Sequence, residues 1–220
     1  RILAPVVFLG LSFWIIDRGD IDTAIQDWIY DPAAHAWPIT KSDRLLRLIF
    51  YDAPKIAIIA FAAGVFAALL WSFWDQRWAA YRRRMAFLLV ILALVPGIAS
   101  LGKAWTNIYC PAQLSRYGGS VPRTGLLEPY PKTFVQEKRG RCFPAGHASG
   151  GFALLALFFV LNRPAARIGG LMTGLGAGWL MGGYQMLIGA HFFSHTVTTM
   201  ALAWILCLLI EPLILRKSVA

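Results

Sequence analysis

Charged residues are scarce in this sequence. They make up 15% of its 220 residues, whereas hydrophobic residues make up 58%. So little charge argues against a soluble globular domain and is typical of a protein that crosses a membrane several times. Acidic residues are the scarcer kind, 11 against 21 basic ones, and the basic residues cluster between apolar segments instead of lining a polar face. This pattern argues against a nucleic-acid partner and favours membrane phosphates as the counter-charge.

Apolar residues recur in six segments, which predict six transmembrane helices. The segments are about 2–16, 54–74, 85–101, 149–161, 168–188 and 193–215. No small-residue cleavage site follows the first segment, so we interpret it as a span and not as a signal peptide. We therefore expect an all-α fold, a single six-span helical membrane domain over residues 1–220.

The basic residues also predict an orientation. Segments 77–84, 162–167 and 216–217 fall on one side if six spans alternate, and their arginines and lysines make that side cytoplasmic. The long loops, about 17–53 and 102–147, then face outward. We expect a multi-pass protein of the bacterial inner membrane, with these loops in the periplasm. The first loop mixes aspartates with tryptophan and tyrosine, which suits short interfacial helices. Residues 104–146 hold six basic and two acidic side chains, which favours an anionic ligand on the outer face.

The most polar motif-like stretch, residues 139–151, reads RGRCFPAGHASGG and opens the fourth apolar segment. His147 is placed near the N-terminus of the predicted helix, where unpaired N–H groups and the helix dipole favour an anion such as phosphate. The alternative is an ordinary loop whose arginines reach lipid headgroups. Topology favours the first interpretation, because Lys103, His147, His191 and His195 all lie at outer ends of spans. We expect them to converge.

The fifth segment carries a glycine every four residues, which predicts close packing against a neighbouring helix. This packing would hold the helix that ends near His191 against the helix that begins near His147. The glycines are Gly170, Gly174, Gly178 and Gly182.

The order and spacing of these polar residues resemble the type 2 phosphatidic acid phosphatase superfamily, which includes lipid phosphate phosphatases and undecaprenyl pyrophosphate phosphatases. The family has three motifs: Lys-x6-Arg-Pro, Pro-Ser-Gly-His and Ser-Arg-x5-His-x3-Asp. Segments 103–111, 144–147 and 184–195 have the same order and internal spacing. The resemblance covers about residues 103–195, and the six-span frame is similar to that of the family's membrane members.

The resemblance implies a set of roles. His191 would attack phosphorus to give a phospho-histidine, His147 would protonate the leaving oxygen, and Lys103 would hold phosphate oxygens. His195 would take the orienting position of the family's Asp. The implied activity is hydrolysis of a lipid phosphate or pyrophosphate, or transfer of the phosphoryl group to another lipid, with neither cofactor nor metal. The lipid remains open among phosphatidate, phosphatidylglycerophosphate, undecaprenyl pyrophosphate and lipid A.

This sequence departs from the family pattern at Cys110, Ala145, Tyr184, Gln185 and His195, which stand where the family has Arg, Ser, Ser, Arg and Asp. A neutral histidine accepts a hydrogen bond but offers no charge to a nucleophilic imidazole. Two acidic residues are alternatives for the orienting role, Glu128 and Asp52. The missing arginines remove bidentate phosphate donors. Candidate phosphate-binding residues besides Lys103 are Arg116, Arg123, Arg139, Arg141, Gly146 and Gln185.

Two other functions remain open. His191 and His195 are four residues apart and could bind zinc together with His147, as in a zinc-dependent membrane hydrolase, although no Glu follows His191 as in metalloprotease helices. A catalytically impaired family member could instead bind or transport lipids.

The three cysteines predict a disulfide next to the site. Cys110 and Cys142 both lie in the outward loop, whereas Cys207 lies within the sixth apolar segment, so we predict a Cys110–Cys142 disulfide.

Overall fold

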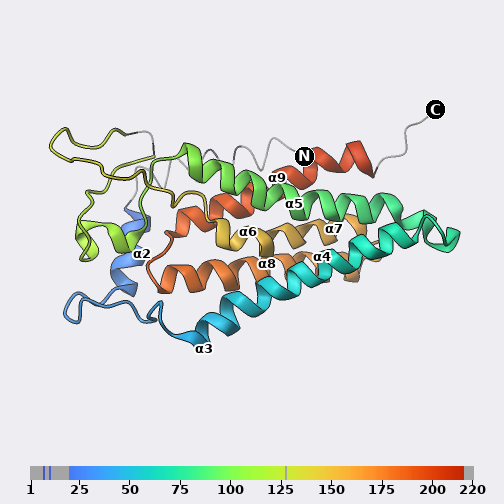
Figure 1. The fold of residues 1–220 in the computed structure, drawn as a ribbon, viewed down its shortest axis with the longest axis horizontal. Helices are drawn as coiled ribbons and strands as arrows, with labels where there is room; N and C mark the ends of the chain where they lie inside the picture. The colour runs from blue at the N-terminus through green and yellow to red at the C-terminus, as the bar shows by residue number, and fades with distance from the viewer. Residues whose placement is uncertain (1–6, 8–9, 11–19, 127, 216–220) are drawn as a thin grey trace.

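The computed structural model describes residues 7, 10, 20–126 and 128–215. Within these residues the regular structure is helical, and extended pairing is limited to two isolated β-bridges. Five helical segments run back and forth along one long bundle (Figure 1). They are α4 (Ala53–Trp71), α5 (Arg82–Trp105), α6 to α7 (Gly146–Val160), α8 (Pro164–Leu187) and α9 (Phe193–Ile214). They correspond to the second to sixth predicted spans. The first predicted span, 2–16, lies outside the described residues except at positions 7 and 10.

Among the described residues, three helical segments are long and apolar enough to cross a membrane: Arg44–Trp71, Gln76–Trp105 and Phe193–Ile214. The segment Gly146–Val160 is a shorter apolar helix, in which α6 (Gly146–Ala153) and α7 (Leu157–Val160) are joined by a 3-10 turn. At about 1.5 Å per residue, the 24-residue helix α8 is about 36 Å long, comparable with the hydrocarbon thickness of a bilayer. These features identify a membrane-spanning helical protein.

The second span begins earlier than predicted. The prediction placed residues up to 53 in a loop, but helix starts at Arg44, because the Asp43 carboxylate accepts the backbone N–H of Leu46 at 3.0 Å and caps it. Two short segments then run without a break into α4: α3 (Arg44–Arg47) and the π-helical turn η1 (Leu48–Asp52). The correction matters for the site, because Arg47, Tyr51 and Lys55 now recur at helical spacing on one element.

The predicted glycine stripe on α8 is confirmed as a packing surface. A Cβ atom added at Gly174 would lie 2.5 Å from the backbone nitrogen of Leu155, and one at Gly178 would lie 2.2 Å from the Phe152 ring. Near the end of the helix, a Cβ at Gly182 would lie 2.5 Å from Thr196 of α9 and 3.4 Å from Ala148 of α6. These glycines therefore let α8 approach α6 and α9 closely at the end of the bundle that carries the polar motifs.

The long loops gather at one end of the bundle together with α2 (Ile21–Ile29), opposite the α4–α5 connection (Figure 1). They have a small aromatic core of their own, made of Tyr30, Tyr109, Leu114, Tyr117, Val121 and Phe192, with Trp37, Tyr130 and Phe134 against it. The first loop does hold a short helix, α2, and its position at the membrane interface stays a prediction. Gly189, after α8, meets this core: its φ is +66°, and a Cβ there would lie 2.3 Å from the Trp37 ring.

Candidate active site

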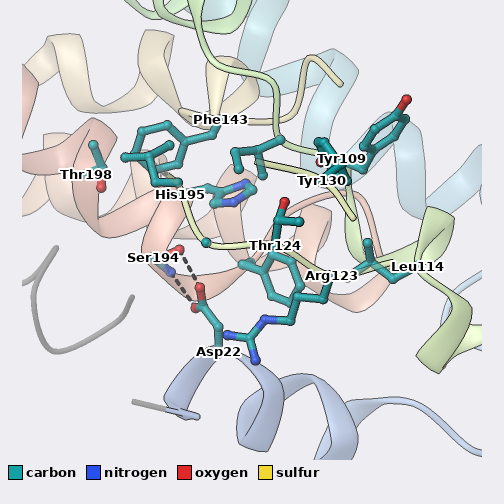
Figure 2. Close-up of a pocket in the computed structure, with 14 residues that line it drawn as sticks. Asp22, Tyr109, Leu114, Arg123, Thr124, Tyr130, Phe143, Ser194, His195 and Thr198 are labelled. Atoms are coloured by element: carbon teal, nitrogen blue, oxygen red, sulfur yellow. Dashed lines mark hydrogen bonds between the residues drawn. The ribbon is translucent and has the colours of Figure 1, made fainter. Parts of the chain in front are cut away.

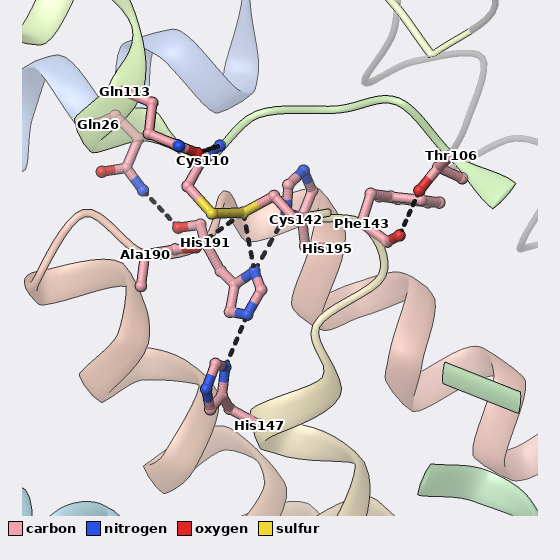
Figure 3. Close-up of a disulfide and its surroundings, with 10 residues drawn as sticks. All are labelled: Gln26, Thr106, Cys110, Gln113, Cys142, Phe143, His147, Ala190, His191 and His195. Atoms are coloured by element: carbon pink, nitrogen blue, oxygen red, sulfur yellow. Dashed lines mark hydrogen bonds between the residues drawn. A yellow bond between two sulfur atoms is a disulfide. The ribbon is translucent and has the colours of Figure 1, made fainter. Parts of the chain in front are cut away.

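Three histidines form a row at the loop-bearing end of the bundle (Figure 3). His147 is the second residue of α6, His191 lies in the connection between α8 and α9, and His195 is in the first turn of α9. Nδ1 of His147 is 3.0 Å from Nε2 of His191, and Nδ1 of His191 is 3.3 Å from Nδ1 of His195. Each ring nitrogen of His191 therefore faces a different histidine. We call these three residues the histidine row.

The row does not surround a single point. His147 and His195 approach opposite nitrogens of the His191 ring, so one metal ion could not be bound by all three side chains at once. The arrangement therefore does not fit the three-histidine zinc site considered from the sequence. Among the described residues, the metal-ligating atoms that lie within 4.8 Å of one another belong to Cys142, His191 and His195.

His191 is suited to act as an unprotonated base or nucleophile. Its side chain is only 1% exposed. This burial, followed by the charges of His195 and Lys103, lowers the pKa of the His191 imidazole well below its usual value, so the ring is neutral at pH 7. If Nδ1 of His191 donates to Nδ1 of His195, the lone pair of Nε2 points toward His147. His195 therefore lies where the resemblance places the orienting residue.

The alternative orienting carboxylates are engaged elsewhere. The Glu128 carboxylate accepts the backbone N–H of Gly125 at 3.1 Å, and Asp52 pairs with Arg47 at 3.2 Å. In the described part of the chain, the His191 ring makes hydrogen-bond contacts with His147, His195 and the sulfur of Cys142. None of these partners is a carboxylate.

A disulfide joins Cys110 and Cys142, the pair predicted from the sequence. Cys142 is fully buried, and its Sγ lies 3.4 Å from Nδ1 of His191 (Figure 3). The bond ties the segment after α5 to the segment before α6. Thr106 ties the same segments by donating its hydroxyl to the Phe143 carbonyl at 2.5 Å. The third cysteine, Cys207, is a buried free thiol in α9, as expected.

Lys103 reaches the row through the small size of Gly146. A Cβ atom at Gly146 would lie only 3.1 Å from Nζ of Lys103 and 3.0 Å from its Cε. Glycine at the start of α6 thus leaves room for the ammonium group beside the unpaired N–H groups of the helix. The charge of Lys103 acts on His147, His191 and His195. The structure therefore brings together the predicted lysine, glycine and three histidines.

A basic cavity adjoins the row. It has a volume of about 350 Å³ and is lined by Lys41, Arg47, Tyr51, His147, Tyr184, Gln185, Ile188 and Ala190. Gln185, one of the predicted phosphate-binding residues, belongs to this lining, and its backbone carbonyl also accepts the N–H groups of Ala190 and His191. The ring of Tyr51 packs edge-on against His147, with centroids 5.2 Å apart.

An apolar groove opens from the same point between α4, α5 and α6. Its volume is about 260 Å³, and its lining includes Ile58, Ile59, Ala62, Leu92, Pro96 and Met181. Tyr51 and His147 line both the groove and the basic cavity, and Lys55 lies at the groove. A ligand at His147 therefore meets cations on one side and a hydrocarbon-like surface within the bundle on the other.

Sequence reasoning missed Arg47, Tyr51 and Lys55. The charges of Arg47 and Lys55 act on His147 together with that of Lys103. The signal that could have found these residues was their four-residue spacing, which places them on one face if helix extends back to Asp43. Treating this stretch as loop hid the spacing.

The helix α2 supports the row from the side of the loops. Asp22 accepts the backbone N–H of Ser194 at 2.9 Å and its hydroxyl at 2.5 Å (Figure 2). One turn later, Gln26 donates its side-chain amide to the His191 carbonyl at 3.0 Å. Burial raises the pKa of Asp22, and the Ser194 hydrogen bonds oppose this shift. Two side chains of α2 thus position the segment that holds His191 and His195.

A small inner cavity of about 60 Å³ lies on the far side of His195. Figure 2 shows His195, Asp22, Arg123 and Thr124 around it, with Tyr109 and Tyr130 beyond. Of the predicted phosphate-binding arginines, Arg123 is the one placed here. It also reaches Asp20 at 3.4 Å and the Thr23 hydroxyl at 3.3 Å.

The other three predicted arginines do not line the basic cavity, the apolar groove or the inner cavity. Arg116 makes a bidentate pair with Asp27, at 2.8 and 2.5 Å, and these bonds hold the pKa of that carboxyl below its usual value. Arg139 donates to the Trp105 carbonyl at 3.1 Å, and Arg141 is exposed. Binding of phosphate by these three remains a prediction.

A profile of the PAP2 superfamily matches residues 84–217, more than half of the chain and all three motif segments. The chain belongs to the PAP2 superfamily. One similar solved structure is described as the first transmembrane PAP2 type phosphatidylglycerolphosphate phosphatase from Bacillus subtilis. The match covers 100% of this chain and 99% of the Bacillus subtilis chain, with 13% sequence identity and a TM-score of 0.56. A search of curated proteins found no match. PAP2 membership and this fold support a membrane lipid phosphatase in general terms.

Proposed function

We propose that this PAP2 protein removes a phosphate from a membrane lipid phosphate or pyrophosphate through a phospho-histidine on His191. The observation that carries the proposal is the 3.0 Å contact between Nε2 of His191 and Nδ1 of His147, a residue that lines both the basic cavity and the apolar groove. A neutral nucleophile and a proton donor thus meet where a phosphate with an apolar anchor would fit.

The reaction then follows from the two contacts of the His191 ring. A bound phosphate replaces the His147–His191 hydrogen bond. The negatively charged phosphate beside His147 keeps that imidazole protonated. The Nε2 lone pair attacks phosphorus, the bond from phosphorus to the lipid oxygen breaks, and this oxygen takes the proton from His147. His195 accepts the Nδ1 proton of His191 in a hydrogen bond and stabilises the cationic ring. In the second half, His147 removes a proton from water, which attacks phosphorus and frees both phosphate and His191.

Beside the motif lysine, Lys103, two further cations supply the charge that the family's two arginines would bring. Lys103, Lys55 and Arg47 all act electrostatically on His147. Lys103 lies beside the N-terminal N–H groups of α6, which add the partial charge of a helix N-terminus. We assign Lys103 to the transferred phosphoryl group, and Arg47 and Lys55 to the remaining oxygens of the headgroup. Phosphoryl transfer depends mainly on such positioning and charge.

The substrate's hydrocarbon anchor occupies the apolar groove. A bulky substitution that fills the groove should therefore weaken the binding of long-chain lipids but not of short-chain, water-soluble lipid phosphates. Ala62 lines the groove, whereas its neighbour Ala63 does not belong to its lining. Ala62→Phe should raise KM for long-chain substrates several-fold, and Ala63→Phe should not. Equal effects of the two variants, or equal effects on both substrates, would argue against this path.

The site faces outward in this proposal. The histidine row lies at the end of the bundle that carries the long loops, and the basic α4–α5 and α7–α8 connections lie at the other end. Arg77, Arg82, Arg163 and Arg167 belong to these connections or directly follow them. The positive-inside rule makes their end cytoplasmic, so the active site opens toward the periplasm in a bacterial inner membrane.

The test is phosphate release from lipid phosphates by the purified protein in detergent micelles, with His191→Ala as the control. Quenched reactions with a lipid labelled in its phosphate should leave acid-labile label on the wild-type protein and none on the control. A chelator should not change the rate. Activity that His191→Ala retains would contradict the mechanism, and lipid binding without any phosphate release would favour a binding protein instead.

A further inference from the structure

The disulfide contacts the histidine row in an arrangement that the phosphatase mechanism does not require. Cys142 Sγ is 3.4 Å from Nδ1 of His191, which is 3.3 Å from Nδ1 of His195. The three ligating atoms lie within 4.8 Å of one another, and all three residues are buried. They come from the segment before α6, the α8–α9 connection and α9. In the oxidised protein Cys142 is bonded to Cys110, so its sulfur is not a thiolate.

Two of the three separations match the edges of a zinc coordination tetrahedron, and the third, between Cys142 Sγ and the His195 ring, is within 4.8 Å. Zinc binds imidazole nitrogen at about 2.0–2.1 Å and thiolate sulfur at about 2.3 Å, which places adjacent ligand atoms about 3.3–3.6 Å apart in tetrahedral geometry. The two short separations here are 3.3 and 3.4 Å. The outer partner of a zinc-bound histidine is also present, because Nε2 of His191 lies 3.0 Å from Nδ1 of His147, which can accept its proton.

We propose that reduction of the Cys110–Cys142 disulfide creates a zinc site formed by the Cys142 thiolate and Nδ1 of both His191 and His195. The fourth position is left for water. This site differs from a zinc-hydrolase centre, since it uses a cysteine, omits His147 and forms only in the reduced protein. Zinc there fixes the His191 ring with its proton on Nε2, the atom that must be unprotonated to attack phosphorus. Bound zinc is therefore an inhibitor.

A phosphine reductant makes this site by a balanced reaction. Cys110 is the more exposed partner, so the phosphine attacks its Sγ. The S–S bond breaks, and its electron pair leaves with Cys142 as a thiolate. Water then attacks the phosphonium, giving a phosphine oxide and the Cys110 thiol. Cys142 is left beside two neutral imidazoles, where a divalent zinc ion replaces the proton that the thiolate would otherwise take up.

Two matched variants test the site without reductant. Cys110→Ser and Cys142→Ser both lack the disulfide and both keep Cys207, but only Cys110→Ser keeps the Cys142 thiolate. Cobalt(II) reports the ligands, because a thiolate ligand gives a charge-transfer absorption band. We expect Cys110→Ser to bind one cobalt with this band and to exchange it for zinc. Cys142→Ser should bind at least about 100-fold more weakly, since loss of outer partners alone costs about 10–100-fold.

The wild-type protein provides a second measurement if either variant fails to fold. Cobalt with this band should bind after phosphine treatment and not before it. Equal binding by both variants, or no thiolate band in Cys110→Ser and in reduced wild type, would overturn the site. Inhibition by zinc rests on the proposed function, but metal binding is measured without substrate. An inactive protein that binds cobalt would contradict the phosphatase and keep the metal site, and an active protein that binds none would do the reverse.

Discussion

Gln26 donates its side-chain amide to the backbone carbonyl of His191, 165 residues later in the chain, at 3.0 Å. Gln26 is fully buried in α2, and Asp22, one turn earlier on the same helix, holds Ser194. Residues four apart on a helix project from one face, so the two side chains reach neighbouring residues, His191 in the α8–α9 connection and Ser194 in the first turn of α9. A short helix of the first loop thus fixes the backbone around the proposed nucleophile.

Loss of this support should slow the chemical step more than it weakens substrate binding. Gln26→Met keeps the size of the side chain but removes the donor, and a hydrogen bond of this kind contributes about 0.5–1.5 kcal/mol, so we expect up to about a tenfold fall in kcat. KM should change little, because Gln26 does not line the basic cavity or the apolar groove. Asp27→Asn is the control. Asp27 lies on the same helix as Gln26, and its replacement breaks the ion pair with Arg116, so this variant should keep wild-type kcat. An equal fall in both variants would indicate a general defect of α2.

Replacement of His191 and replacement of His195 should have unequal effects. His191→Ala removes the nucleophile and should abolish phosphate release. His195→Ala removes a neutral hydrogen-bond acceptor, so its loss should be smaller than the roughly 10⁴-fold seen when a catalytic carboxylate is neutralised. The measurement is the initial rate of phosphate release by folded, purified variants. Total loss in both variants, with both folded, would contradict the assigned roles.

The cations should also contribute unequally. Lys103→Met should lower kcat by about 10²-fold, because removal of one donor that stabilises developing charge typically costs 10²–10³-fold. Arg47→Met and Lys55→Met should mainly raise KM, since these residues face the headgroup in our assignment. Arg116→Met is the matched control, because Arg116 is paired with Asp27 away from the basic cavity. If Arg116→Met were the most damaging variant, the phosphate would have to bind elsewhere.

The lowered pKa of His191 predicts a pH dependence of stability. Below about pH 6.5, the usual histidine pKa, the unfolded chain binds a proton that the folded His191 does not bind. The free energy of unfolding should therefore decrease as the pH falls from 7 to 5, by up to about 1.4 kcal/mol per pH unit for this one group. His191→Gln cannot take up the proton and should lose part of this dependence. Thermal unfolding of both proteins at each pH measures the difference. Parallel curves would mean that His191 titrates normally when folded.

The sequence by itself determined the class of fold and the residues to which we assign the reaction. A long apolar run predicts a transmembrane helix, because side chains that face lipid must be apolar. The glycine stripe predicts close helix packing, because a glycine every four residues lies on one face of a helix. Lys103, His147 and His191 could be found because motif spacing and alternating spans place their helix ends on one face. The cysteine pair followed from the same alternation, since two of three cysteines fall in one loop.

Only the tertiary structure decided what surrounds these residues. Arg47, Tyr51 and Lys55 reach His147 because the Asp43 cap extends a helix into what the sequence shows as a polar loop. Asp22 and Gln26 act on a connection far along the chain, and no local pattern encodes a contact between such distant segments. The choice between Arg116 as a phosphate ligand and as the partner of Asp27 likewise depends on which groups the fold brings within hydrogen-bonding distance. The residue types limit which reactions and contacts are possible. The distances between side chains decide which of them occur, and these distances are set by the packing of the fold.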